Sequence, residues 1–214
     1  FDDRLLTGYR FASPARVNFM LGCLEQLRGS LRDLGGDLFI RHGRPETILP
    51  GLAEETGAES VHWTTDSSPW SNRRDREVTA ALEEAGVAAR RHPGAYIVDD
   101  PGEIFSGKGT PYTVYSPFFK AWKEVGRRPL VDVPAQICAP EGLDPGAMPS
   151  IEDLGFDPGV ATGSTSFEPG EAAARKATRA YLNGGLSTYA DSRNSPAGGS
   201  SRLSPYIRWG CVSP

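Results

Sequence analysis

The chain has only three cysteines and three histidines among its 214 residues. Cys23, Cys138 and Cys211 are far apart in the sequence, no CxxC motif occurs, and no histidine lies at metal-ligand spacing from a cysteine. Neither a disulfide framework nor a zinc site is therefore indicated. No histidine stands at a telling distance from a nucleophile or a carboxylate, so the sequence offers no catalytic triad.

Long hydrophobic runs are missing as well. No stretch of about 18 apolar residues occurs, and the chain does not open on a charged segment followed by an apolar one. These absences argue against a membrane-spanning helix and an export signal. We expect a cytoplasmic protein with no membrane partner.

Positive charge is scarce overall but not at the end of the chain. The net charge of −4 argues against a generally basic nucleic-acid-binding protein. From Glu171 onward, however, the sequence holds six basic residues and two acidic ones. An anion would bind in this final segment, although basic residues on the solvated face of a helix would give the same count. The six are Arg175, Lys176, Arg179, Arg193, Arg202 and Arg208.

Helical and extended patterns alternate through the first part of the chain. An apolar stripe over residues 13–34 predicts a helix with Ser13 as N-cap and Gly35 after its end. The segments that follow are a strand at 37–41, a helix at 45–56, a strand at 60–64, a helix at 72–85 and an extended piece at 87–92. Such alternation predicts an α/β domain with a parallel sheet and right-handed crossovers.

Residues 129–170 contain seven prolines and six glycines with little periodicity, which is typical of a connector that lies over a surface or is partly disordered. Helical spacing returns at Glu171 and continues to the Gly184–Gly185 pair. This return indicates the beginning of a second, helical domain.

The last 26 residues combine glycines and serines with arginine. Glycines let backbone N–H groups approach an anion, hydroxyls add hydrogen bonds, and a guanidinium neutralises charge. On composition alone a solvated turn remains the alternative.

Three ordered motifs resemble the DNA photolyase and cryptochrome family. The first is the R-x-G-x-P turn at 41–45, and the second is a Y-x-V-[FY]-[ST]-P-F-x-x-x-W block at 112–122. The third begins at Tyr189, continues with Arg193-Asn194 and ends in the serine-rich run 200–206, where the family more often has Thr at the position of Ser200.

The resemblance implies a Rossmann-like α/β antenna domain over residues 1–133, an interdomain connector over 134–170, and the start of an all-helical FAD-binding domain over 171–214. It implies FAD as cofactor and damaged DNA containing a pyrimidine dimer as partner of a monomeric enzyme, deoxyribodipyrimidine photolyase. An antenna chromophore, methenyltetrahydrofolate or 8-hydroxy-deazaflavin, would bind near the loop at 66–70. The residues that match the family's FAD contacts are Tyr189, Ser200, Ser201, Arg202, Leu203 and Ser204.

The resemblance also implies that parts are absent. The family's opening strand has no counterpart, so the strands at 37–41 and 60–64 would lose neighbours and leave open sheet edges. We expect a fragment that is inactive alone, with no catalytic residue and no metal site. Two alternatives stay open: a cryptochrome-like photoreceptor, and an α/β nucleotide-binding module without photochemistry. Tyr206 and Trp209 are predicted to be core residues.

Overall fold

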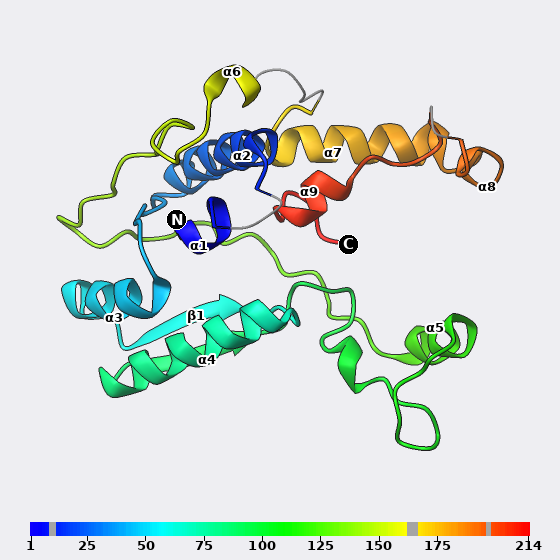
Figure 1. Ribbon diagram of the computed structural model, residues 1–214, viewed down its shortest axis with the longest axis horizontal. Helices are drawn as coiled ribbons and strands as arrows, with labels where there is room; N and C mark the ends of the chain where they lie inside the picture. The colour runs from blue at the N-terminus through cyan, green and yellow to red at the C-terminus, as the bar shows by residue number, and fades with distance from the viewer. Residues whose placement is uncertain (9–11, 162–166, 196–197) are drawn as a thin grey trace. The chain divides into compact units, whose positions relative to one another are not determined.

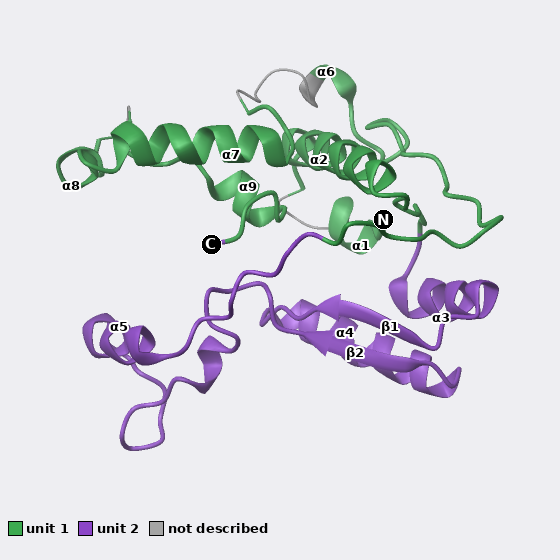
Figure 2. Ribbon diagram, turned by 180° about the vertical axis from the view of Figure 1, so that it is seen from behind, with its two compact units in different colours: residues 1–42, 134–213 green, residues 43–133, 214 purple. Residues whose placement is uncertain are grey.

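The computed structural model describes residues 1–8, 12–161, 167–195 and 198–214 (Figure 1). The chain forms two compact units (Figure 2). Unit 1 comprises residues 1–42 and 134–213, and unit 2 comprises residues 43–133 with Pro214. Unit 1 is therefore assembled from two separate stretches of sequence.

Unit 2 contains the α/β part of the fold. Its elements are α3 (Pro45–Thr56), β1 (Ser60–Thr64), α4 (Pro69–Glu84), β2 (Ala88–His92), the 3₁₀ turn η1 (Pro101–Glu103) and α5 (Tyr115–Glu124). β1 and β2 pair in parallel, with Ser60 opposite Ala88, and α4 connects them. Within the described residues the sheet has these two strands, so the expected α/β class and the open edge of 60–64 are confirmed.

Proline and glycine mark the ends of the helices in unit 2. α3 begins at Pro45 and ends before Gly57, whose φ of +66° is the left-handed conformation that favours glycine. α4 begins at Pro69 rather than at Asn72, because the Ser68 side chain accepts a hydrogen bond from the Ser71 backbone N–H at 3.2 Å. The prediction missed this capping turn.

The predicted strand at 37–41 was wrong. These residues have no strand assignment, and their backbone groups bond elsewhere. The Ile40 N–H donates to the Pro145 carbonyl at 2.7 Å, and the N-terminal amine donates to the Arg41 carbonyl at 2.6 Å. Because the connector takes the Ile40 N–H, the segment is extended but joins no ladder.

Unit 1 is built around one long helix. Its elements are α1 (Asp3–Leu6), α2 (Pro14–Asp33), α6 (Pro158–Ala161), α7 (Glu171–Ala180), the π-turn η2 (Tyr181–Gly185), α8 (Tyr189–Ser192) and α9 (Ser204–Arg208). α2 begins and ends as predicted, with Pro14 at its first position and Gly35 just beyond its end. The predicted return to helix at Glu171 is confirmed by α7.

α2 buries two faces against different parts of unit 1. Val17, Met20 and Leu21 pack with Ile151 and Leu154 of the connector. Phe19 and Cys23 pack with α7 and α9 in a second cluster. The connector therefore carries core residues and does more than pass over a surface.

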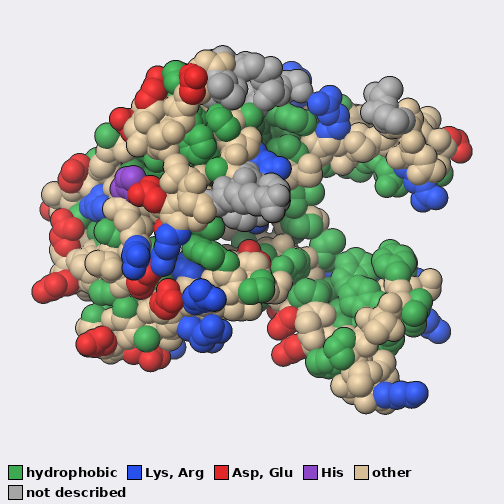
Figure 3. Space-filling model, in the orientation of Figure 1, with side chains coloured by type: hydrophobic (Ala, Val, Ile, Leu, Met, Phe, Trp, Pro, Cys, Tyr) green, Lys and Arg blue, Asp and Glu red, His purple; other side chains and the backbone are tan. Residues whose placement is uncertain are grey.

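Two features concern the hydrophobic side chains of the described helices. Among the described residues, no helix is both long and apolar enough to cross a membrane. Hydrophobic side chains gather over α5 in Figure 3, where Val114, Tyr115 and Phe119 are exposed.

Candidate functional site

The residues expected to contact FAD occupy α8, α9 and the loop between them. Tyr189 is the first residue of α8 and its side chain is 42% exposed. Ser200 and Ser204 are exposed, and Ser201 is half-buried. Ser204 is also the first residue of α9. Polar groups of the serine-rich run thus face solvent from a loop held at both ends by helical turns.

Gly199 fixes how this loop returns to α8. Its φ is +92°, and a Cβ at this position would meet the backbone carbonyl of Ser192, the last residue of α8. Only glycine combines that backbone angle with so close an approach. The structure therefore brings the end of α8 against the residue that precedes Ser200.

The backbone turns again at Arg202, the one non-glycine residue with positive φ (+54°) in the part of the chain that the structure describes. The Ser201 hydroxyl accepts a 3.4 Å hydrogen bond from the Leu203 N–H across this turn. The Arg202 guanidinium lies over the Phe167 ring, 4.9 Å from its centroid. A cation on an aromatic face limits where the side chain can move.

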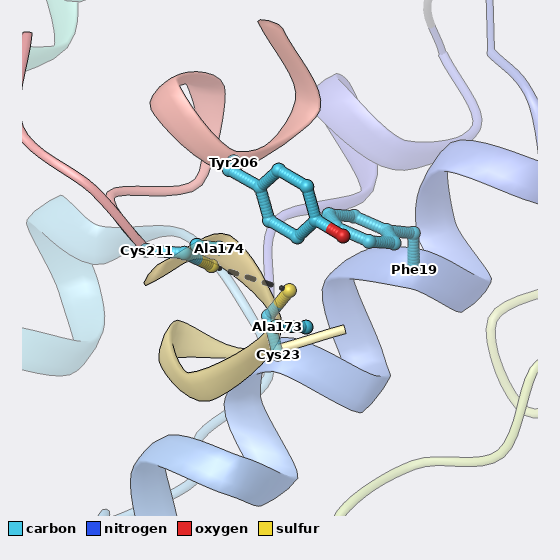
Figure 4. Packing of buried hydrophobic residues seen from close by; sticks show 6 residues of the cluster. All are labelled: Phe19, Cys23, Ala173, Ala174, Tyr206 and Cys211. Atoms are coloured by element: carbon cyan, nitrogen blue, oxygen red, sulfur yellow. Dashed lines mark hydrogen bonds between the residues drawn. The ribbon is translucent and has the colours of Figure 1, made fainter. Parts of the chain in front are cut away.

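The loop is anchored through the start of α9. Figure 4 shows Tyr206 and Phe19 against each other, with ring centroids 5.6 Å apart in edge-to-face geometry. The Tyr206 hydroxyl donates to the Glu168 carbonyl at 2.9 Å. Burial raises the pKa of Tyr206, with Glu168 adding to the shift, so the hydroxyl stays protonated as a donor. Leu203 packs against the same cluster.

Sequence reasoning located these residues in part. Tyr206 is buried as predicted, whereas Trp209 is 38% exposed and the prediction of a core position was wrong, because α9 ends there in a turn. Phe167 was missed as the partner of Arg202, since the two are separated by 35 positions and share no motif. No group of three or more potential metal ligands occurs among the described residues.

The loop after β1 shows local order near the place expected for an antenna chromophore. The Ser67 hydroxyl and the Tyr96 hydroxyl are 2.5 Å apart, and the Asp66 carboxylate accepts the Ser68 N–H at 3.0 Å. These bonds define a structured turn at the carboxyl end of a parallel strand, where ligands of α/β sheets bind.

Comparison with known proteins gives the family. Residues 1–139 match the model described as DNA photolyase. The chain is 38% identical to a deoxyribodipyrimidine photo-lyase of Halobacterium salinarum over 219 residues, which cover 99% of this chain and 44% of the relative. A cryptochrome DASH of Natronomonas pharaonis is 35% identical and is matched over 100% of this chain and 47% of its own length.

The chain belongs to the DNA photolyase family.

A solved structure within this family agrees. The class III photolyase from Agrobacterium tumefaciens superimposes with a TM-score of 0.82 at 26% identity, over 96% of this chain and 44% of that chain. The chain thus spans less than half the length of these photolyase-family relatives. The family model covers the α/β unit and ends at residue 139, before the loop between α8 and α9.

The residues of that loop fit the phosphate end of a flavin dinucleotide. FAD carries a diphosphate, and the loop offers exposed hydroxyls, a backbone turned twice through positive φ, and the Arg202 guanidinium. These are the donors that a diphosphate needs.

Proposed function

We propose that the protein to which this chain belongs is a deoxyribodipyrimidine photolyase, which repairs cyclobutane pyrimidine dimers in DNA by light-driven electron transfer from reduced FAD. Its place in the DNA photolyase family carries this proposal. The orientation of the serine-rich loop, fixed by Gly199 and anchored by Tyr206, supports it.

The described residues would hold the cofactor by its diphosphate. Ser200 and Ser204 would donate their hydroxyls, Ser201 and Leu203 would contribute the turn, and Arg202 would neutralise charge. Tyr189 would lie against the phosphates or the ribose. FAD, when bound and reduced, supplies the electron that splits the dimer, and the chain's own residues position and orient it. Neither a catalytic acid or base nor a metal ion is assigned a role.

The whole protein would have the family's layout. Residues 1–133 would be the antenna domain, 134–170 the connector and 171–214 the start of the helical FAD domain. Its partner would be DNA with a pyrimidine dimer, and a second chromophore, methenyltetrahydrofolate or 8-hydroxy-deazaflavin, would collect light near residues 66–70. We expect a cytoplasmic monomer.

The test is repair under blue light. The chain is expressed with its natural flanking sequence on both sides, its flavin absorbance is measured after purification, and thymine dimers in an oligonucleotide are followed with and without illumination. Light-dependent loss of dimers supports the proposal. Colourless protein contradicts it.

A cryptochrome-like photoreceptor is the second candidate, favoured by the similarity to a cryptochrome DASH at 35% identity. Such a protein would bind the same flavin and signal instead of repairing. Yellow protein that leaves both single- and double-stranded dimers intact under illumination would favour it over the photolyase.

The assignment of the loop is tested separately. In the extended protein, Ser201→Ala and Tyr189→Ala should weaken FAD binding about tenfold or more. The first removes the hydroxyl that holds the turn at Leu203, and the second removes the ring that would lie against the ligand. Ser187→Ala, an exposed serine of the same segment, is the control and should leave affinity unchanged. Unchanged affinity in all three variants would favour an α/β nucleotide-binding module without photochemistry.

For the 214-residue chain alone we expect no stable FAD complex and no repair. A few phosphate contacts must offset the ordering of both the loop and the ligand, which costs several kcal/mol. Titration with FAD followed by flavin fluorescence checks this. Stoichiometric binding to the isolated chain would contradict it.

A further inference from the structure

Two cysteines that are far apart in the sequence lie together in unit 1. Cys23 comes from the middle of α2, and Cys211 follows α9 (Figure 4). Their sulfur atoms are 3.5 Å apart, and the Cys211 thiol donates a hydrogen bond to the Cys23 sulfur. Both side chains are buried, at 8% and 9% exposure. The third cysteine, Cys138, is exposed elsewhere in the unit.

The backbone holds Cys211 in this position. α9 ends in a Schellman motif in which Gly210 has a φ of +71°. The Cys211 N–H donates to the Tyr206 carbonyl at 2.9 Å, and the Gly210 N–H donates to the Ile207 carbonyl at 3.2 Å. The residue after the glycine in this motif normally makes a hydrophobic contact with the third-last helical residue. Here those residues are Cys211 and Tyr206, which share one cluster.

The other cysteine is held as firmly. Phe19, one helical turn before Cys23, packs edge-to-face on Tyr206. Phe19 of α2 therefore lies against Tyr206, and Cys23 of α2 lies against Cys211. Ala173 and Ala174 of α7 complete the cluster, and their small side chains let α7 lie close to α2.

A cavity beside the pair has room for a small oxidant. A cavity of about 150 Å³ is lined by both cysteines together with Met20, Leu27, Gly170 and Trp209. One water molecule occupies roughly 10–15 Å³ of a cavity measured in this way, so hydrogen peroxide, which is little larger than water, fits in it. A metal ion finds too few ligands, because no third metal-binding side chain joins the two thiols in the described part of the chain.

We infer that Cys23 and Cys211 form a redox-active dithiol, which hydrogen peroxide oxidises to a disulfide that links the residues after α9 to α2. In the first step one thiol gives up its proton as its sulfur attacks a peroxide oxygen, the O–O bond breaks, the proton goes to the departing oxygen, and one sulfenic acid and one water form. In the second step the other sulfur attacks the sulfenic sulfur, and a second water leaves as the S–S bond forms. Two electrons and two protons pass from the thiols to the peroxide.

The required movement is small. A disulfide has an S–S distance of about 2.05 Å, and each cysteine has a single side-chain torsion that can close the gap. Burial raises the pKa of Cys23 to about 12, so this thiol is protonated at neutral pH. The resting state is the reduced pair.

The experiment uses the three cysteines of the chain as their own control. The purified chain is treated with hydrogen peroxide, remaining thiols are alkylated, and cross-linked peptides are quantified by mass spectrometry. We expect the Cys23–Cys211 peptide to exceed either peptide containing Cys138 at least tenfold. The same oxidation in urea gives the reference: an unfolded chain closes the shorter Cys138–Cys211 loop roughly fourfold more often.

Variants sharpen the result. Cys138→Ser should still form the cross-link and lose two hydrogen atoms in mass, whereas Cys138→Ser combined with Cys211→Ser should not. Hydrogen exchange in residues 198–211 should slow on oxidation of the first variant only. A dominant peptide through Cys138, a distribution equal to that in urea, chains linked into dimers, or sulfinic acid on both cysteines would each overturn the inference.

Discussion

Gly198 and Gly199 are adjacent, but a side chain has space at only one of the two positions. Gly199 has a φ of +92° and would press a Cβ into the Ser192 backbone, whereas a Cβ on Gly198 would meet nothing within 4 Å. Gly199→Ala should therefore destabilise the chain by about 1–3 kcal/mol, because a positive φ and a backbone contact both oppose it. Gly198→Ala is the matched control. Urea denaturation of both variants checks this, and equal midpoints would contradict it.

The Tyr206 hydroxyl makes a single backbone bond that can be removed without changing the ring. Tyr206→Phe leaves the Glu168 carbonyl without this donor and should cost about 1 kcal/mol. Tyr189→Phe serves as the control, since that ring is 42% exposed and the change should stay within about 0.5 kcal/mol. Thermal unfolding of the two variants measures the difference. A Tyr206→Phe protein as stable as its parent would mean that water replaces the bond.

At the scale of single residues, the sequence predicted those with local causes. Gly35 and Gly57 mark helix ends through their backbone freedom, and the structure has them there; Ser13 is at the N-cap position of α2 but makes no side-chain capping bond. The partners of Arg202 and Cys23 were not predictable, because Phe167 and Cys211 reach them only after the chain has folded back. Sequence spacing did not indicate the contact between Cys23 and Cys211, which are 188 residues apart and meet only in the folded chain.

At the scale of elements, arginines near the end of α2 bind the segment that follows the helix by ion pairs and the connector by a hydrogen bond. The Arg28 guanidinium donates to the Asp37 carboxylate at 2.8 Å and to the Gly146 carbonyl at 3.1 Å, while Arg32 reaches the same carboxylate at 3.0 Å. Hydrogen bonds from Arg28 and Arg32 hold the pKa of Asp37 well below its usual range. These bonds hold Asp37 against the C-terminal end of α2, although residues 37–41 form no strand.

The cluster predicts an acid-sensitive contribution to stability. Because the folded pKa of Asp37 is depressed, its stabilisation is complete above the unfolded value near 3.9 and is lost as the pH falls through the folded pKa. Asp37→Asn should lower stability at pH 7 and should flatten the decline between pH 4 and pH 2. Denaturation at several pH values measures this. Asp33→Asn, at the neighbouring end of α2, controls for the change in net charge.

Helices and strands were predictable where the hydrophobic periodicity and the flanking glycine or proline residues indicate the same boundaries. α3, β1, β2 and α7 lie where the sequence indicated them. The segment at 37–41 failed because an apolar run predicts burial, whereas a strand also requires a partner with free backbone groups. Here the connector takes the Ile40 bond instead. The connector itself was predicted from its prolines, but the burial of Ile151 and Leu154 on α2 was not.

At the scale of the whole molecule, each unit has its own buried residues. Leu82 in α4 is fully buried, and Leu82→Ala should cost about 2–5 kcal/mol. We expect faster hydrogen exchange confined to residues 43–133, with residues 134–213 unchanged. Leu182→Ala, at a side chain that is 57% exposed, should alter neither unit measurably. Loss of protection throughout the chain after Leu82→Ala would show that the units unfold together.

The division into units also sets an order of events during synthesis. Unit 2 is continuous in sequence apart from Pro214 and can fold as soon as it leaves the ribosome. Unit 1 must wait, because Tyr206 and Cys211 are made long after Phe19 and Cys23. The two cysteines are 188 residues apart, which at 5–20 residues per second is a delay of roughly 10 to 40 s. Throughout that interval a nascent α2 exposes the apolar face that α7 and α9 will cover, and a chaperone that binds apolar helices could shield it.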